Sequence, residues 1–398
     1  MTVPGDKSIS HRALMHAALA QGTSRLSGCL QAGVTQAMID CLGQLGIEIE
    51  NDRDQSVLVH GGKFRSPAAR LNCGNSGATI RMLLGALAAQ RAVVATLGGS
   101  AGLEQRPIKR VTDPLRLMGA DIEGDTAPLT LRGRPLHGIQ YTLPVASAQI
   151  KAAVLLAALQ ADQPTTLHEP GPSRDHSERL LRSLGVPLAT HGYRLTVQPV
   201  ASVPSFDLSI PGDLSSAAGL LAAAVLTSGS NLTIQAVGVN PTRTGILDAL
   251  IAMGAEVEVA NEREVGNEPV AEVTIRHSEL RGIVIEGDWV VRMIDEFPLL
   301  AVLATQARGE TIVRDAGELR VKESDRIGAL VGELRRLGAH IEEQPAGFTI
   351  EGPSPLRGEV VNSHGDHRLA MALVVAGLAA AGETTILQAE AYHESFPN

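Results

Sequence analysis

The hydrophobic positions of this chain gather in long stretches rich in alanine and leucine, which are separated by short polar segments. Six of these stretches predict buried helices, because each is apolar around most of a helical surface for several turns. They cover approximately residues 10–20, 79–89, 147–160, 215–227, 296–306 and 367–381. Several of them end in a glycine turn followed by a run of Thr, Leu and Ile, which predicts that a strand follows the helix.

A second pattern alternates with the first one. Amphipathic stretches end in Leu or Met, then glycine, then Ala, Ile or Val, at Gly46, Gly119, Gly185, Gly254 and Gly338. Each glycine stands where a helix end needs a left-handed residue. The alternative is an accidental spacing of common helix ends, but all five sites have a helical pattern before the glycine and a strand pattern after it. A period of about 70 residues with two helices and several strands predicts an α/β unit repeated six times.

The number of repeats and the length of 398 residues predict two domains of three units each. The Pro-Gly break near Pro211 indicates the boundary, so we expect one domain over 5–211 and another over 212–398. Residues 1–4 are expected to pair with the second domain. We expect the active site in the cleft between the two domains.

Composition and charge exclude several classes of protein. The net charge is −9 and aromatic residues make up 2%, which argues against binding of nucleic acid. The apolar runs are shorter than the roughly 18–20 residues that span a membrane. Cys29, Cys41 and Cys73 have no metal-ligand spacing, so we expect neither a metal site nor disulfides, and we expect a cytoplasmic location.

Polar residues cluster at the starts of the six apolar helices. Helix N-termini carry unpaired N–H groups and the positive end of the helix dipole, so they bind anions. Plain capping is the alternative, and it accounts for the Ser and Asp residues in these clusters. Capping does not explain Lys7, Arg12, Arg81, Gln149 and Arg368, because a cation is unfavourable at a helix N-terminus unless an anion joins it. The pattern therefore predicts a cleft that binds anionic small molecules.

Two further segments bear on ligand binding. Gly74-Asn75-Ser76-Gly77 lacks the spacing of a nucleotide-binding P-loop, and we expect no cofactor. Lys322, Glu323 and Arg326 lie close together at the start of an amphipathic helix. The alternative for this second segment is an ion-pair face exposed to solvent.

Five motifs closely resemble those of the 5-enolpyruvylshikimate-3-phosphate synthase family, and the resemblance extends from Val3 to Pro397. The motifs are Pro4-Gly5-Asp6-Lys7-Ser8-Ile9-Ser10-His11-Arg12-Ala13, Gly74-Asn75-Ser76-Gly77, Glu104-Gln105-Arg106-Pro107-Ile108, Arg320-Val321-Lys322-Glu323-Ser324-Asp325-Arg326 and Asp366-His367-Arg368-Leu369-Ala370-Met371. The resemblance implies a two-domain inverse α/β barrel built from six repeated βαβαββ-type units, three per domain. It also implies transfer of the carboxyvinyl group of phosphoenolpyruvate to the 5-hydroxyl of shikimate 3-phosphate, with release of phosphate, in aromatic amino-acid biosynthesis.

The same resemblance implies the residues of the site. Shikimate 3-phosphate would be held by Ser8, Arg12, Ser147, Ala148, Gln149, Asp295 and Lys322, with Ser173 or Arg174 at its phosphate. Phosphoenolpyruvate would be held by Lys7, Gly77, Arg106, Gln149, Arg326 and Arg368, and Asn75 is a further candidate. Asp295 and Glu323 would exchange protons with the substrates, and Lys7 would share in these transfers. His367 is expected to orient its neighbours rather than to carry a proton.

The chain departs from the family pattern at three positions. Ala78 stands where many members have Thr, Glu318 where some have Asn, and Glu394 where some have a Lys that contacts phosphoenolpyruvate. Glyphosate is the expected inhibitor, because Gly77 leaves room for it beside shikimate 3-phosphate. We expect a monomer.

Two alternatives remain. One is a UDP-N-acetylglucosamine enolpyruvyl transferase, the sister enzyme with the same fold. Its mobile loop carries a reactive Cys before an Arg-Pro pair, but the matching segment here, 98–107, has none. The other alternative is a non-catalytic repeat scaffold, which would neither turn over substrates nor bind two anions in a coupled way.

Overall fold

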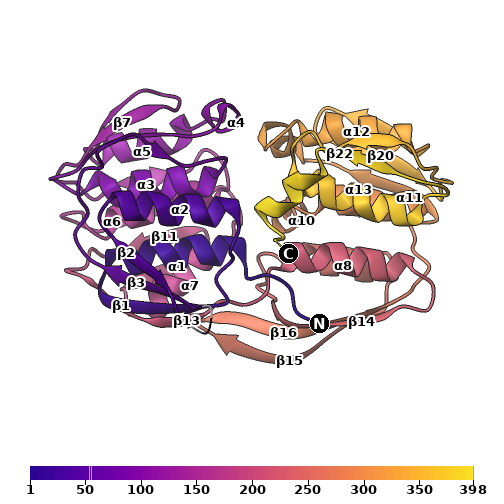
Figure 1. Cartoon of the computed structure of the whole chain (residues 1–398), viewed down its shortest axis with the longest axis horizontal. Coiled ribbons are helices and arrows are strands. Elements are labelled where there is room, and N and C mark those ends of the chain that lie inside the picture. The colour runs from indigo at the N-terminus through magenta and orange to yellow at the C-terminus, as the bar shows by residue number, and fades with distance from the viewer. Residues whose placement is uncertain (53, 55, 398) are drawn as a thin grey trace. The chain divides into compact units, whose positions relative to one another are not determined.

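The computed structural model describes residues 1–52, 54 and 56–397, and the chain forms two compact units (Figure 1). The first-half unit consists of Gly5–Ile210 together with Glu264–Glu268. The second-half unit consists of Met1–Pro4, Pro211–Arg263 and Pro269–Asn398. The strands of the described residues belong to six sheets, three in each unit.

Two repeats of the first-half unit follow one complete pattern: strand, apolar helix, strand, amphipathic helix and a pair of strands. The first of them contains β4 (Leu71–Asn72), α3 (Gly77–Ala88), β5 (Val94–Gly98), α4 (Ala101–Glu104), α5 (Lys109–Leu117), β6 (Asp121–Glu123) and β7 (Leu129–Arg132). The next contains β8 (Gln140–Thr142), α6 (Ala148–Ala158), β9 (Thr165–His168), α7 (His176–Ser183), β10 (Leu188–His191) and β11 (Arg194–Val197). The sheet orders, β4-β5-β7-β6 and β8-β9-β11-β10, are equivalent, with the first pair parallel and the others antiparallel.

The remaining repeat of this unit takes its leading strand from a distant part of the chain. It contains α1 (Lys7–Leu19), β1 (Ala20–Ser27), α2 (Gly33–Gln44), β2 (Glu48–Asn51) and β3 (Val57–Gly61). The short strands β12 (Val203–Pro204) and β13 (Asp207–Ser209) pair with β1 in parallel. They therefore occupy the place that β4 and β8 hold in the other two sheets.

The second-half unit repeats the pattern. Its first repeat contains α8 (Leu214–Leu226), β14 (Asn231–Gly238), α9 (Gly245–Ala252), β15 (Val257–Val265) and β16 (Glu268–Arg276). Its second contains β17 (Val284–Ile285), α10 (Asp288–Arg292), α11 (Phe297–Gln306), β18 (Gly309–Val313), the 3₁₀ helix η1 (Gly317–Val321), α12 (Arg326–Arg336), β19 (His340–Gln344) and β20 (Gly347–Gly352). Its third contains β21 (Val360–Asn362), α13 (His367–Ala379), β22 (Thr385–Leu387) and the 3₁₀ helix η2 (Ala389–Glu394). In this last repeat the described residues form only the strand-helix-strand part, followed by η2.

The six apolar stretches do form helices, namely α1, α3, α6, α8, α11 and α13. The largest difference from the prediction is at α1, which begins at Lys7 rather than at residue 10, because Asp6 caps it by accepting a hydrogen bond from the amide of Ile9. The five glycines of the second pattern all have positive φ angles between 74° and 102°. The predicted left-handed helix ends are therefore confirmed.

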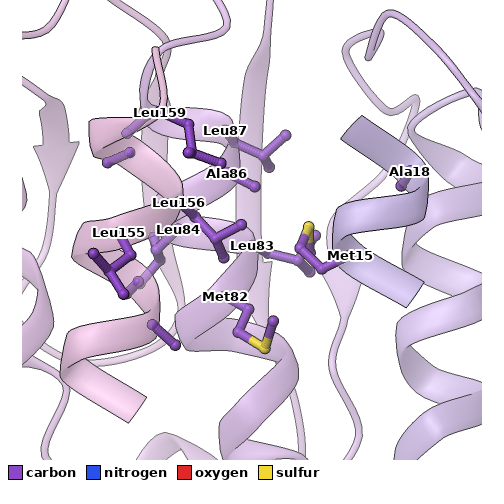
Figure 2. Packing of buried hydrophobic residues seen from close by; sticks show 14 of the residues in the cluster. Met15, Ala18, Met82, Leu83, Leu84, Ala86, Leu87, Leu155, Leu156 and Leu159 are labelled. Carbon is purple, nitrogen blue, oxygen red and sulfur yellow. The ribbon is translucent and has the colours of Figure 1, made fainter. Parts of the chain in front are cut away.

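The core of the first-half unit is built on α1, α3 and α6, as Figure 2 shows for Met15, Leu83 and Leu156. Full burial of such a side chain contributes about 1.5–3 kcal/mol to the free energy of unfolding. Gly85 lets α3 approach α6 closely, since a Cβ there would collide with the carbonyl oxygen of Ala153. Among the described helices, none has the length and apolar character needed to cross a bilayer.

Candidate active site

In the first-half unit, the three apolar helices all begin with a capping side chain. Ser76 accepts a hydrogen bond from the amide of Thr79 at 3.2 Å, and Ser147 accepts one from the amide of Ile150 at 3.5 Å. Together with Asp6 on α1, each of these caps satisfies one first-turn amide of its helix. The predicted residues Lys7, Ser8, Gly77, Ala148 and Gln149 lie in these first turns.

Arg12 links three helices of this unit. Its side chain is 5% exposed and donates to the Ser8 carbonyl at 2.9 Å, the Ala148 carbonyl at 3.3 Å and the Ser177 hydroxyl at 2.8 Å. Burial lowers the pKa of Arg12, and the nearby carboxylate of Glu178 partly offsets this effect. Arg12 therefore fixes the start of α1 against α6 and α7.

A second cationic group surrounds the start of α3. Arg81 donates from Nη1 to the Gly77 carbonyl at 3.0 Å and to Oε1 of Gln149 at 2.7 Å. Arg106 donates to Oδ1 of Asn75 at 3.3 Å. A Cβ on Gly77 would collide with Nη1 of Arg81 and lie 3.3 Å from Nη1 of Arg106. The structure thus brings Asn75, Gly77, Arg106 and Gln149 together around Arg81, a residue that the sequence prediction placed at a helix start but not among the site residues.

Beside Ser173 lies a buried charge network that the sequence analysis missed. Lys151, which is 1% exposed, pairs with Glu169 at 2.9 Å and with Glu178 at 2.6 Å. The Ser173 hydroxyl donates to Glu169. Burial raises the pKa of Glu178, although Lys151 acts against this shift. The available signal was a lysine in the middle of the apolar stretch that forms α6.

His11 lies among the starts of three helices. Its ring is 1% exposed, and Nδ1 lies 2.7 Å from the Lys7 carbonyl oxygen. Its Nε2 lies 3.1 Å from the Ser76 hydroxyl and 3.2 Å from the Val34 carbonyl oxygen on α2. Burial lowers the pKa of His11 to about 4, so the ring is neutral at pH 7.

In the second-half unit, Arg326 gathers three carboxylates. It donates from Nε to Asp366 at 2.7 Å, from Nη2 to Glu323 at 2.6 Å and from Nη1 to Asp295 at 3.3 Å. Burial alone would lower the pKa of Arg326, but the carboxylates, Asp366 first among them, raise it. Lys322 lies 4.0 Å from Asp295. The structure thus groups both predicted proton-exchanging carboxylates around one buried guanidinium.

The start of α13 carries the two other predicted residues of this unit. Asp366 caps the helix by accepting from the Arg368 amide at 2.9 Å. His367 Nδ1 lies 3.8 Å from Oε2 of Glu394, and His367 is 2% exposed. Arg368 is 4% exposed, and its Nε has no hydrogen-bond partner among the described residues. The side chains of His367 and Arg368 are therefore both held in the first turn of a helix whose dipole favours an anion.

The predicted residues fall into two sets. The first-half unit holds Lys7, Ser8, Arg12, Asn75, Gly77, Arg106, Ser147, Ala148, Gln149, Ser173 and Arg174. The second-half unit holds Asp295, Lys322, Glu323, Arg326, His367 and Arg368. Over the described part of the chain, no cluster of three His, Cys, Asp or Glu side chains could hold a metal ion.

Comparison with known proteins gives a consistent result. The sequence profile of EPSP synthase (3-phosphoshikimate 1-carboxyvinyltransferase) matches residues 1–398. The chain is 50% identical to a 3-phosphoshikimate 1-carboxyvinyltransferase of Gloeobacter violaceus over 404 aligned positions, which cover 100% of the chain and 94% of the relative. It is 47% identical to one of Brevibacillus brevis, with coverage of 99% and 94%.

Solved structures agree with the sequence matches. An EPSP synthase from Acinetobacter baumannii has a TM-score of 0.89 at 41% identity, over 100% of this chain and 93% of that one. The enolpyruvyl transferase NikO from Streptomyces tendae has a TM-score of 0.79 at 21% identity, over 100% and 92% of the two chains, which shows a shared fold. The α/β fold is confirmed, and neither alternative function is favoured. The chain therefore belongs to the EPSP synthase family.

Proposed function

We propose that this chain is a 3-phosphoshikimate 1-carboxyvinyltransferase of the shikimate pathway. It transfers the carboxyvinyl group of phosphoenolpyruvate to the 5-hydroxyl of shikimate 3-phosphate and releases inorganic phosphate. The observation that carries the proposal is the match to the family over the whole chain, with 50% identity to a relative of that name. The cations and helix starts of both units suit two polyanionic substrates.

The roles proposed for the binding residues follow the grouping in each unit. Shikimate 3-phosphate is held by the starts of α1 and α6, through Ser8, Arg12 and residues 147–149, and by Asp295 and Lys322. Ser173 or Arg174 contacts its phosphate. Phosphoenolpyruvate is held mainly by Lys7 on α1, by the Asn75–Gly77 segment with Arg106, and by Arg326 and Arg368; Gln149 contacts both substrates.

The proposed reaction has two steps, an addition and an elimination. In the addition step, the 5-hydroxyl oxygen bonds to C2 of phosphoenolpyruvate, its proton passes to a carboxylate, and C3 gains a proton to become a methyl group. In the elimination step, the methyl group returns a proton and the C2–O bond to phosphate breaks. Asp295 and Glu323 exchange these protons with the help of Lys7, and the surrounding donors stabilise the anionic tetrahedral intermediate.

His367 is proposed to orient rather than to carry protons. It is buried beside Arg368 and lies 3.8 Å from Glu394, so it can hold the start of α13 and η2 together. Glu394 itself is an anion, and it cannot supply the phosphoenolpyruvate contact that Lys makes in some members of the family. That contact falls to the arginines.

We also propose that glyphosate inhibits the chain, that the chain acts as a monomer and that it works in the cytoplasm. Glyphosate would occupy part of the phosphoenolpyruvate site beside Gly77. In Gly77→Ala, the added methyl must displace the Arg81 guanidinium. We expect this variant to lose more affinity for glyphosate than for phosphoenolpyruvate, and equal losses would contradict the placement.

Phosphate release from shikimate 3-phosphate and phosphoenolpyruvate tests the proposed function. We expect turnover in the unsubstituted chain and none in Asp295→Ala or Lys7→Ala, with unchanged circular dichroism in both variants. Lys109→Ala is the matched control for Lys7, because Lys109 is also the first residue of a helix, is exposed and pairs with Asp113 at 2.8 Å. Undiminished phosphate release in Asp295→Ala or Lys7→Ala would refute the assignment of these residues.

A further inference from the structure

Three helix starts of the first-half unit meet at His11. Nδ1 contacts the Lys7 carbonyl of α1 at 2.7 Å, and Nε2 contacts the Ser76 cap of α3 at 3.1 Å. The Val34 carbonyl in the first turn of α2 lies 3.2 Å from Nε2. The ring is 1% exposed, so water does not compete for these contacts.

The neighbours of His11 define how its hydrogen bonds run. Both neighbouring carbonyl oxygens can only accept, and the shorter contact, 2.7 Å to Lys7, takes the ring proton on Nδ1. The neutral ring then keeps Nε2 as an acceptor, so its 3.2 Å approach to the Val34 carbonyl is a contact and not a hydrogen bond. The Ser76 oxygen accepts from the Thr79 amide at 3.2 Å, which leaves its own proton to donate to Nε2. His11 is thus a bridge between the residue that begins α1 and the residue that caps α3.

This bridge differs from the one that Arg12 makes. Arg12 joins α1 to α6 through the Ala148 carbonyl, at 3.3 Å. Under the proposed function, α1 and α6 share shikimate 3-phosphate, whereas α1 and α3 share phosphoenolpyruvate through Lys7 and Gly77. The spacing that His11 fixes therefore matters for only one of the two substrates.

We propose that His11 is a positioning residue for phosphoenolpyruvate, which acts by holding Lys7 of α1 and the Ser76–Gly77 start of α3 at the spacing that this substrate needs. The inference rests on the proposed function. His11 itself touches no substrate and exchanges no proton in the reaction.

The test compares His11→Ala with His16→Ala by steady-state kinetics in both substrates. His16 is the matched control: it lies on the same helix, is 2% exposed, and has its Nδ1 2.8 Å from the carbonyl four residues earlier, that of Arg12. Its Nε2 has no hydrogen-bond partner among the described residues, so it bridges to no other helix. Circular dichroism and urea unfolding of both variants measure how much of each effect is a loss of stability.

We expect His11→Ala to raise the KM for phosphoenolpyruvate about tenfold, as loss of one buried hydrogen bond implies, and to leave the KM for shikimate 3-phosphate within about twofold. We expect His16→Ala to change neither KM. His11→Gln places an amide at the position of Nε2 and should restore most of the loss. Because glutamine fills most of the space that the His11 side chain occupies, this variant remains informative if His11→Ala fails to fold.

The possible outcomes are distinct. Absence of phosphate release by the unsubstituted chain refutes the proposed function and the inference with it. Turnover in that chain with the same KM for phosphoenolpyruvate in His11→Ala and His16→Ala refutes the inference alone. Equal increases in both KM values for His11→Ala would show that His11 only stabilises the unit, which also refutes it.

Discussion

Acid should destabilise the first-half unit through two buried histidines of one helix, His11 and His16. Burial lowers the pKa of each to about 4, whereas an unfolded histidine has its usual pKa of about 6.5. Between these values the unfolded chain binds protons that the folded chain does not. Stability is therefore complete above about pH 6.5 and is lost as the pH falls toward 4.

The size of the effect follows from the two pKa values. At pH 5 the difference in proton binding costs about 2 kcal/mol for each histidine, hence about 4 kcal/mol for the pair. His16→Leu removes one titrating group and keeps an apolar side chain in the core. The variant should therefore lose only about 2 kcal/mol between pH 7 and pH 5, even if its stability at pH 7 is lower.

Urea unfolding from pH 8 to pH 5, followed by far-UV circular dichroism, measures how the free energy of unfolding depends on pH in the parent and in His16→Leu. Fluorescence of Trp289, the one tryptophan of the chain, serves as an internal control because it reports on the second-half unit. The substitution should leave the pH dependence of that signal unchanged. Equal pH dependence in the parent and in His16→Leu by circular dichroism would refute the reasoning.

Other substitutions test the remaining structural claims. Arg326→Met leaves three carboxylates without their guanidinium, so it should cost about 3–5 kcal/mol, measured by the Trp289 fluorescence transition in urea; a loss below about 1 kcal/mol contradicts the network. Lys151→Met should cost a similar amount at pH 8 and less at pH 5, because burial raises the pKa of Glu178 and this carboxylate can take up a proton once Lys151 is gone; an equal loss at both pH values would contradict this account. Gly85→Ala should destabilise by about 1–3 kcal/mol in thermal unfolding, because its methyl meets the Ala153 carbonyl. Gly43→Ala is the control, since no atom lies within 4 Å of the added methyl, and it should stabilise by about 0.5–1 kcal/mol.

The helices and their ends were predictable because their signals are local. A continuous Ala- and Leu-rich run of about a dozen residues identifies α3 or α13, and the glycine after each amphipathic helix identifies where that helix stops. The expectation of an anion-binding site followed from cations at helix starts, where only an anion makes them favourable, whereas the individual site residues followed from the resemblance. Resemblance to a family supplied the substrates, which the pattern alone does not name.

The buried charge networks were not predictable, because their partners are far apart in the sequence. Arg326 and Asp366 are 40 residues apart, and Lys151 and Glu169 are 18 residues apart. A single sequence shows that Lys151 interrupts an apolar helix, but not which carboxylate compensates its charge. The same holds for His11, whose link to Ser76 spans 65 residues.

The hairpin between β15 and β16 has a consequence for biosynthesis of the chain. Its tip, Glu264–Glu268, belongs to the first-half unit, where Glu268 lies 2.7 Å from His176 and Asn267 accepts from Arg179 at 2.9 Å. A ribosome that has made residues 1–210 has therefore not yet made all of this unit. Until residue 268 emerges, His176 lacks its acidic partner, so the first-half unit reaches its final state only after synthesis of the second-half unit has passed Pro211–Arg263.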